Sequence, residues 1–154
     1  YPHYADAYEK IYRTVNDREL AFFSSTDKRW LVHGDAHPEN VIKMGENKTA
    51  VIDFTDLCLS DFARDIGTFL QQLEYMCNRK IGDEKYIHDL KNSFLDNYFA
   101  NSRINLDDEL EARIANYYYW TAIRTATFFL IKADCEPERA FPIIEMVKNG
   151  LNIK

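Results

Sequence analysis

The sequence predicts a mainly helical α+β domain that contains a small β-hairpin, and three observations support this prediction. The chain has 154 residues, a length that suits one domain (residues 1–154) with a hydrophobic core of its own. Apolar residues recur at helical spacing over most of the sequence. Between residues 29 and 53, short apolar runs are instead separated by polar turn residues, as is typical of strands.

The strand-like part of the sequence is short and lies in the first half of the chain. Residues 29–33 predict a strand that runs directly into a Gly-Asp turn. Residues 40–44 and 49–53 predict two further strands. Since residues 45–48 between them are typical of turns, these two strands are expected to pair as a β-hairpin.

Helices are expected over most of the remaining sequence. The apolar spacing predicts helices over residues 4–23, from residue 60 to a break at residues 82–83, and over residues 86–98, 107–133 and 137–148. Ser60 or Asp61 is the candidate N-cap of the second helix. Gly150 is the candidate C-cap that ends the last helix.

Composition excludes several classes of function. The formal net charge is -6 at pH 7, which gives no reason to expect binding to nucleic acid. No apolar run approaches the ~20 residues that cross a bilayer, so no membrane partner is expected. Cys58, Cys77 and Cys135 form no zinc-like pair and are interpreted as reduced thiols, which favours a cytoplasmic location.

Acidic and amide side chains lie at the ends of the predicted strands. Asp35 follows one strand, and Asp53 ends another. If the hairpin forms, Asn40 and Asp53 come from the same end of it, which brings two oxygen donors of the kind that Mg²⁺ prefers close together. Asp35 would lie just before them as a base. One base with two metal ligands is the arrangement that phosphoryl transfer requires.

These residues resemble the motifs of the aminoglycoside phosphotransferase family, which includes choline-kinase-like and other small-molecule kinases. The matching motifs are His33-Gly34-Asp35, Asn40 five residues after the aspartate, Ile52-Asp53-Phe54, and Asp65-Ile66-Gly67. The resemblance extends over residues 31–73. It implies the C-terminal lobe of a protein-kinase-like fold, in which a small β-hairpin insertion carries the catalytic loop.

The resemblance also implies roles for individual residues. Asp35 would be the catalytic base, and Asn40 and Asp53 would be the Mg²⁺ ligands that hold the metal of ATP or GTP. Asp65 would open a helix and brace the catalytic loop. His33 and His37 would support the loop rather than act in catalysis. The expected reaction is transfer of a phosphoryl group from the nucleotide to a hydroxyl of a small molecule.

One part of the family pattern is missing from this sequence. Enzymes of this kind have an N-terminal lobe, with a strand lysine and a loop that hold the nucleotide phosphates. Only about thirty residues precede His33, they read as helical, and they contain no glycine-rich phosphate loop. The chain is therefore interpreted as the C-terminal lobe of a longer protein. Without the N-terminal nucleotide lobe as its partner, the chain is expected to be inactive.

Two alternative functions remain open at this point. A metal-dependent hydrolase would use His33, Asp35 and His37 as ligands together with Asp53, although such sites usually contain more histidines. A non-catalytic module with a kinase fold would bind without turning over. The acceptor is also open among aminoglycosides, choline, homoserine, sugars and protein-linked targets. The acidic residues 107–111 are either a patch for a cationic substrate or the acidic first turn of a helix.

Overall fold

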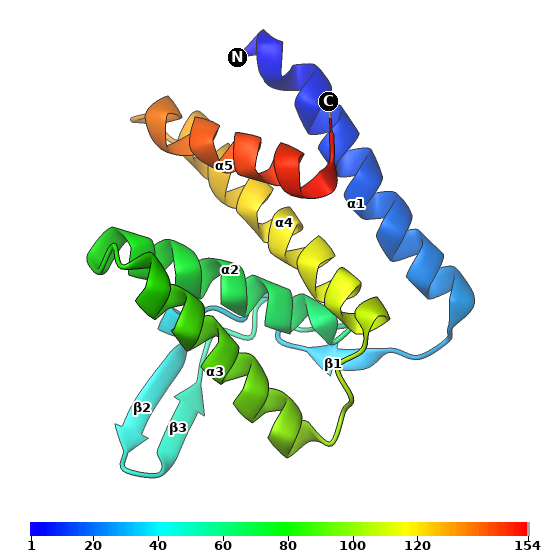
Figure 1. Cartoon of the computed structure of the whole chain (residues 1–154), viewed down its shortest axis with the longest axis vertical. Coiled ribbons are helices and arrows are strands. Elements are labelled where there is room, and N and C mark those ends of the chain that lie inside the picture. Colours follow the sequence, from blue (N-terminus) through cyan, green and yellow to red (C-terminus); the bar gives the residue numbers. More distant parts are fainter. Residues whose placement is uncertain (154) are drawn as a thin grey trace.

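The mainly helical α+β class is confirmed by a computed structural model that describes residues 1–153. Figure 1 shows the α-helices packed together, with the strands at one end. The helices are η1 (Pro2–Tyr4), α1 (Ala5–Ser25), η2 (Pro38–Asn40), α2 (Ala63–Lys80), α3 (Glu84–Ser102), α4 (Asp108–Ile131) and α5 (Pro137–Leu151). The strands are β1 (Trp30–Val32), β2 (Val41–Gly45), β3 (Lys48–Val51) and β4 (Cys58–Ser60). Each predicted helix and strand is present in this order.

Helix α4 is the centre of the molecule because it contributes to both hydrophobic cores. In the first core, buried residues of α4 pack against Ile11 and Val15 of α1 and against the apolar face of α5. In the second core, Leu110, Ile114 and Tyr117 of α4 pack against α2. A helix that is buried on several sides needs apolar residues around most of its circumference, which α4 has.

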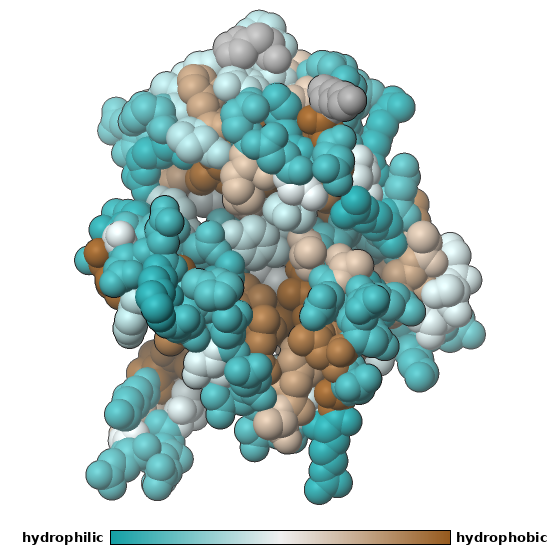
Figure 2. Space-filling view, in the orientation of Figure 1, coloured by the Kyte–Doolittle hydropathy of each residue, from teal (hydrophilic) through white to brown (hydrophobic). Residues whose placement is uncertain are grey.

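The face shown in Figure 2 is mainly hydrophilic, but apolar side chains surface in a hollow between α3 and the beginning of α4. Partly buried apolar residues of α3 and of the chain that leads to α4 pack against the second core. They are Phe94, Leu95, Tyr98, Phe99, Ile104 and Leu106.

In the described part of the chain, the β structure consists of two small antiparallel ribbons. Strands β2 and β3 form the predicted hairpin, with Val41 opposite Val51, and Figure 1 shows this hairpin projecting away from the helices. Strand β1 pairs with β4, and Leu31 lies opposite Leu59. Strand β4 was not predicted. Its three residues adopt an extended conformation because β1 supplies a partner, and three residues contain too little alternation to be recognised alone.

Both predicted helix caps need correction. Helix α2 begins at Ala63 with Phe62 in the N-cap position, not Ser60 or Asp61. Asp61 still accepts a hydrogen bond from the Ala63 amide at 3.1 Å, so its carboxylate satisfies one free donor of the first turn. The predicted C-cap Gly150 lies inside α5, where the absence of a Cβ makes room for the Tyr119 ring.

Helix α5 ends one residue later than Gly150, at Leu151. Asn152 adopts the left-handed conformation (φ 57°) that the C-terminal cap requires, which asparagine tolerates better than most residues. Within residues 1–153, no helix is both long enough and apolar enough to cross a membrane. The three cysteines are unpaired thiols.

Candidate active site

The loop that follows β1 depends on a glycine. Gly34 has a φ of 83°, in the left-handed region that side chains rarely adopt. A Cβ at this position would also lie only 2.1 Å from the Asp56 carbonyl oxygen. A side chain therefore fits neither the backbone conformation nor the available space. Gly34 lets the chain turn sharply and presents Asp35 immediately after the strand.

Asp65 ties this loop to the first turn of α2. Its carboxylate accepts one hydrogen bond from the His33 amide at 2.7 Å and a second from the Gly34 amide at 2.9 Å. The neighbouring Arg64 donates to the Gly34 carbonyl oxygen at 3.1 Å. Hydrogen bonds to charged groups are stronger than those between neutral groups. The loop backbone is thus fixed to the helix at consecutive positions.

The two histidines of the motif lie on either side of Asp35. The Nε2 atom of His33 donates to the Ile52 carbonyl oxygen at 2.9 Å, which connects the end of β1 to the chain that leaves the hairpin. The Nε2 atom of His37 lies 3.6 Å from the Asp35 carboxylate. His33 therefore contacts backbone, whereas His37 is the ionisable neighbour of Asp35.

Asn40 and Asp53 come from the same end of the hairpin, as its pairing predicts. The Asn40 carbonyl oxygen accepts a hydrogen bond from the Ile52 amide at 3.0 Å, one residue before Asp53. The side chain of Asn40 is buried, and its Nδ2 atom donates to the Asp35 carbonyl oxygen at 3.0 Å. Asp53 has a φ of 61°, an uncommon conformation for a residue other than glycine, and its carboxylate accepts from the Thr55 hydroxyl.

The donor atoms at this end of the hairpin fit a magnesium ion in their chemistry. Because the Asn40 Nδ2 atom donates to the Asp35 carbonyl oxygen, the Asn40 Oδ1 atom is the group left to act as a metal ligand. Asp53 is exposed and supplies carboxylate oxygen. Amide and carboxylate oxygens are the hard ligands that Mg²⁺ prefers.

The ligand set of the alternative hydrolase is not brought together. Across the described part of the chain, no three side chains of His, Cys, Asp or Glu are grouped so that they could hold a metal. His33 instead donates to a carbonyl oxygen and Asp53 accepts from a hydroxyl. The geometry therefore gives no support to a hydrolytic metal centre.

Asp35 opens onto a cavity of about 410 Å³ between α2, α4 and the beginning of α5. Its side chain is 38% exposed, so the carboxylate is accessible to a molecule in the cavity. The other lining residues are Gln72, Tyr75, Arg79, Thr121, Arg124, Thr125, Phe128, Phe129, Lys132 and Arg139. We call this space the Asp35 cavity. It gives the Asp35 carboxylate access to a small molecule.

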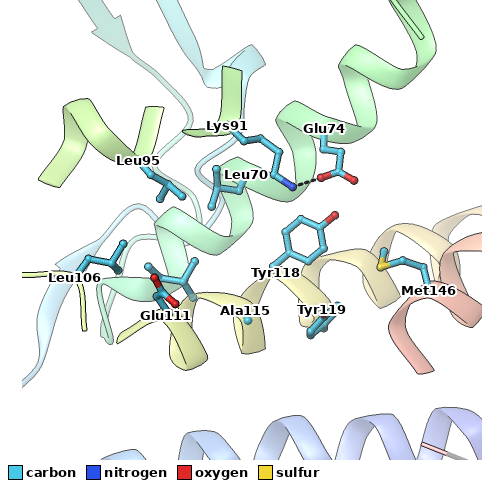
Figure 3. A pocket seen from close by; sticks show the side chains of 11 residues that line it. Leu70, Glu74, Lys91, Leu95, Leu106, Glu111, Ala115, Tyr118, Tyr119 and Met146 are labelled. Carbon is cyan, nitrogen blue, oxygen red and sulfur yellow. Dashed lines mark hydrogen bonds and ion pairs between the residues drawn. The ribbon is translucent and has the colours of Figure 1, made fainter. Parts of the chain in front are cut away.

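A second cavity of about 400 Å³, shown in Figure 3, lies between α2, α3 and α4. Leucine side chains and the Tyr118 ring line it, and an ion pair between Lys91 and Glu74 crosses one side. Asp35 is not among its lining residues. A hydroxyl bound in this cavity would not reach the candidate base, so the Asp35 cavity is the better candidate for the site of reaction.

The model of the phosphotransferase enzyme family (APH) matches residues 4–111, more than half of the chain. The chain belongs to this family. The resemblance found in the sequence motifs is thereby confirmed. No curated protein and no solved structure shows significant similarity to the chain.

The cationic lining of the Asp35 cavity is a feature of this APH-family chain that the sequence did not predict. Its basic residues are Arg79, Arg124, Lys132 and Arg139. Helical spacing carries little signal for these residues, since Arg124 lies within α4 whereas Lys132 is the C-cap residue that follows it. Which faces of α2 and α4 meet across a cavity is decided by packing, which the spacing does not give.

Proposed function

We propose that this chain is the catalytic, C-terminal part of a nucleotide-dependent phosphotransferase that acts on a hydroxyl of a small molecule. Membership of the APH family supports phosphotransferase chemistry. The observation that carries the proposal is the arrangement around Asp35. Its carboxylate opens onto a cavity, while its backbone holds the side chain of Asn40, which shares one hairpin end with Asp53.

In this proposal Asp35 positions and deprotonates the acceptor hydroxyl. As the proton passes to the carboxylate, the acceptor oxygen forms a bond to the γ-phosphorus of ATP or GTP. The bond between this phosphorus and the bridging oxygen breaks, and the nucleoside diphosphate leaves. His37 lies near Asp35 and helps to orient it, while Asp65 and His33 hold the loop.

Asn40 and Asp53 would hold the magnesium ion. When bound, Mg²⁺ neutralises charge on the nucleotide phosphates. The hydrogen bond from Asn40 Nδ2 to the Asp35 carbonyl oxygen sets the orientation of the amide, which keeps its oxygen available. Because this contact runs to the Asp35 backbone, replacement of the Asp35 side chain leaves it in place, whereas replacement of Asn40 is expected to shift Asp35.

We also propose that a nucleotide-binding lobe covers the β structure and that the chain turns over negligibly without it. Exposed apolar side chains concentrate around the candidate site. They are Leu31, Val41, Ile42, Met44, Val51, Ile52, Phe54, Leu57 and Leu59. Leu31 and Leu59 lie opposite each other in the β1–β4 register and are 69% and 68% exposed. Apolar surface of this kind marks a contact with another structural unit.

A cytoplasmic location remains a prediction that rests on the unpaired cysteines.

The test is the Asp35→Asn variant in the protein that carries both lobes. Release of nucleoside diphosphate is measured with ATP and with GTP against a panel of hydroxyl compounds. The variant keeps the shape of the side chain but cannot accept the proton. We expect its rate of transfer to fall by about 10²–10⁴-fold.

Glu39→Gln is the matched control, because Glu39 belongs to the same segment and is exposed. It removes the same charge, and we expect it to keep a rate close to that of the wild type. Equal rates for Asp35→Asn and the wild type would contradict the role of Asp35. Absence of transfer by the wild-type protein with every acceptor and nucleotide would favour a non-catalytic module.

A further inference from the structure

The Asp35 cavity is basic although the chain as a whole is acidic. Among residues 1–153, four cationic side chains line it, together with Asp35 as the one acidic residue of the lining. They are Arg79, Arg124, Lys132 and Arg139. The formal net charge of the chain is -6, so this concentration of positive charge runs against the overall composition. Charges of one sign in a cavity raise the local concentration of ligands of the opposite sign.

Two of the four cations are already paired with a carboxylate. Lys132 and Arg139 both contact Glu136, with Lys132 Nζ at 2.8 Å from its carboxylate. The pKa of Glu136 is lowered, chiefly by the hydrogen bond from Lys132, so the carboxylate stays ionised near neutral pH. These two residues therefore contribute less net charge to the cavity than their number suggests.

Arg79 and Arg124 are the uncompensated cations of the cavity. Within residues 1–153, neither guanidinium is ion-paired with a carboxylate, and the Arg79 guanidinium lies 5.9 Å from the centre of the Tyr75 ring. Arg124 is an exposed residue of α4, and its side chain lines the cavity. A guanidinium offers several donors in a planar fork, which suits phosphate and carboxylate oxygens.

Arg139, a further residue of the cavity wall, is held in a fixed position. Its guanidinium stacks 3.9 Å from the centre of the Phe129 ring and donates to the Tyr75 hydroxyl as well as to Glu136. Since its position is set by three neighbours, it needs little reordering when a ligand binds. The cavity thus combines two uncompensated cations with one wall that is already ordered.

We infer that the acceptor of this phosphotransferase is a small hydroxyl compound with an anionic group, which Arg79 and Arg124 bind in the Asp35 cavity. This inference rests on the proposed function. The anionic group would fix the molecule at the basic wall, so that its hydroxyl points towards Asp35. A cationic acceptor would instead meet like charge at this wall, which disfavours its binding.

The acidic residues at the beginning of α4 do not offer a competing site for a cationic acceptor next to Asp35. The Asp107 carboxylate accepts a hydrogen bond from the Leu110 amide at 2.9 Å and so serves as the N-cap of α4. The lining of the Asp35 cavity comes from the other half of this helix, from Thr121 onward. The acidic turn is thus explained by helix capping.

The inference is tested by isothermal titration calorimetry of the chain with four probes. Glycerol 3-phosphate carries a phosphate, glycerate carries a carboxylate, glycerol is neutral and choline is cationic. We expect binding of glycerol 3-phosphate or glycerate in preference to glycerol and choline, and the better of the two identifies the anionic group. Arg124→Gln and Arg79→Gln should each weaken this binding by about tenfold or more.

Arg13→Gln is the matched control, because this substitution removes the same charge. Arg13 lies on the exposed face of α1, where it pairs with Glu9. It should leave the affinity unchanged. Equal affinity for glycerol, choline and the anions, or unchanged affinity in Arg124→Gln, would overturn the inference. Displacement of the anion by MgATP, with Arg124→Gln weakening both ligands equally, would also overturn it, because the cavity would then hold nucleotide phosphates.

The proposed function and the inference fail in different ways. Anion binding that depends on Arg124, in a protein without phosphoryl transfer, would support the anion site and remove the proposed reaction. Transfer to choline that depends on Asp35, with no anion binding, would keep the reaction and overturn the inference. Asp35→Asn should keep anion binding, because it removes a negative charge from the cavity, while its rate of transfer falls by about 10²–10⁴-fold.

Discussion

Asp65 is the residue on which the geometry of the candidate loop depends most directly. Its carboxylate accepts from two consecutive amides, those of His33 and Gly34. In Asp65→Asn, the side-chain NH₂ group would face one of these amides, and two donors would oppose each other. We expect the free energy of unfolding to fall by about 1–3 kcal/mol, as measured by urea denaturation.

Asp27→Asn provides the control for this variant. Asp27 is an exposed acid that precedes β1, so its replacement removes the same charge without changing the loop. We expect its stability to stay within about 0.5 kcal/mol of the wild type. If the two variants have equal stability, Asp65 does not hold the loop.

Tyr118 makes the stability of the chain depend on pH in the alkaline range. Burial and, after it, the neighbouring Glu74 raise the pKa of Tyr118 far above its ordinary value of 10.0. Below about pH 10, the hydroxyl is protonated in both the folded and unfolded states, and its contribution is fully present. Above about pH 10, the unfolded chain releases the proton while the folded chain keeps the proton, so the free energy of unfolding falls as pH rises.

Tyr118→Phe removes this titrating group. It should therefore make the decline in the free energy of unfolding less steep, by up to about 1.4 kcal/mol per pH unit. Urea denaturation between pH 9 and 11.5, a window set by the ordinary tyrosine pKa, measures the slope. The slope is the informative quantity, because loss of the interaction between the Tyr118 hydroxyl and Glu74 lowers stability at every pH. Identical slopes would show that Tyr118 does not titrate as described.

Sequence reasoning at this scale succeeded where a residue's position follows from local backbone geometry. The hairpin register brought Asn40 and Asp53 to the same end, and this followed from two short strands and a turn. The sequence did not predict that Arg79 and Arg124 line the same cavity, since they come from different helices. Their proximity depends on tertiary packing, which leaves little trace in local spacing.

At the scale of elements, the contact between α2 and α4 requires a glycine. A Cβ on Gly67 would lie 2.5 Å from the Ile114 carbonyl oxygen and 2.8 Å from the Tyr118 amide nitrogen. Both atoms belong to the backbone of α4 and cannot move aside without shifting the helix. Gly67→Ala is expected to lower the free energy of unfolding by about 1–3 kcal/mol, measured by urea denaturation.

Gly45→Ala is the matched control in the hairpin. A Cβ on Gly45 would have no neighbouring atom within 4 Å, so the added methyl group meets open space. We expect little change in its stability. The account of the α2–α4 contact would be wrong if Gly67→Ala proved as stable as Gly45→Ala.

The helices could be predicted from sequence because each carries a periodic apolar face, but their ends were less predictable. Gly150 reads as a terminator, yet α5 continues through it and ends at Leu151. Strand β4 was missed because its three residues become a strand only through pairing with β1. Both differences arise where a tertiary contact decides the local conformation.

At the scale of the whole molecule, the exposed apolar side chains of the β structure predict binding of a hydrophobic dye. The folded chain should enhance the fluorescence of 8-anilinonaphthalene-1-sulfonate. Leu31→Glu with Leu59→Glu should reduce this signal, because the two leucines lie opposite each other and are exposed. Stability should change little. Leu20→Glu, at an exposed position on α1, is the control.

An unchanged dye signal in the double variant would show that this leucine pair is not an accessible hydrophobic surface. In the protein with both lobes, the wild-type signal should be lost if the nucleotide-binding lobe covers the pair. The β2–β3 hairpin, which Figure 1 shows projecting away from the helices, carries further exposed apolar side chains.

The central claim is that Asp35 and the Asn40–Asp53 pair perform different parts of one phosphoryl transfer. It is tested most directly by the Mg²⁺ dependence of transfer in the two-lobe protein. We predict that Asp53→Asn raises the Mg²⁺ concentration needed for half-maximal rate by about tenfold or more, because a ligand is weakened. Asp35→Asn should lower the maximal rate without changing that concentration. The same Mg²⁺ requirement in Asp53→Asn and the wild type would contradict the account.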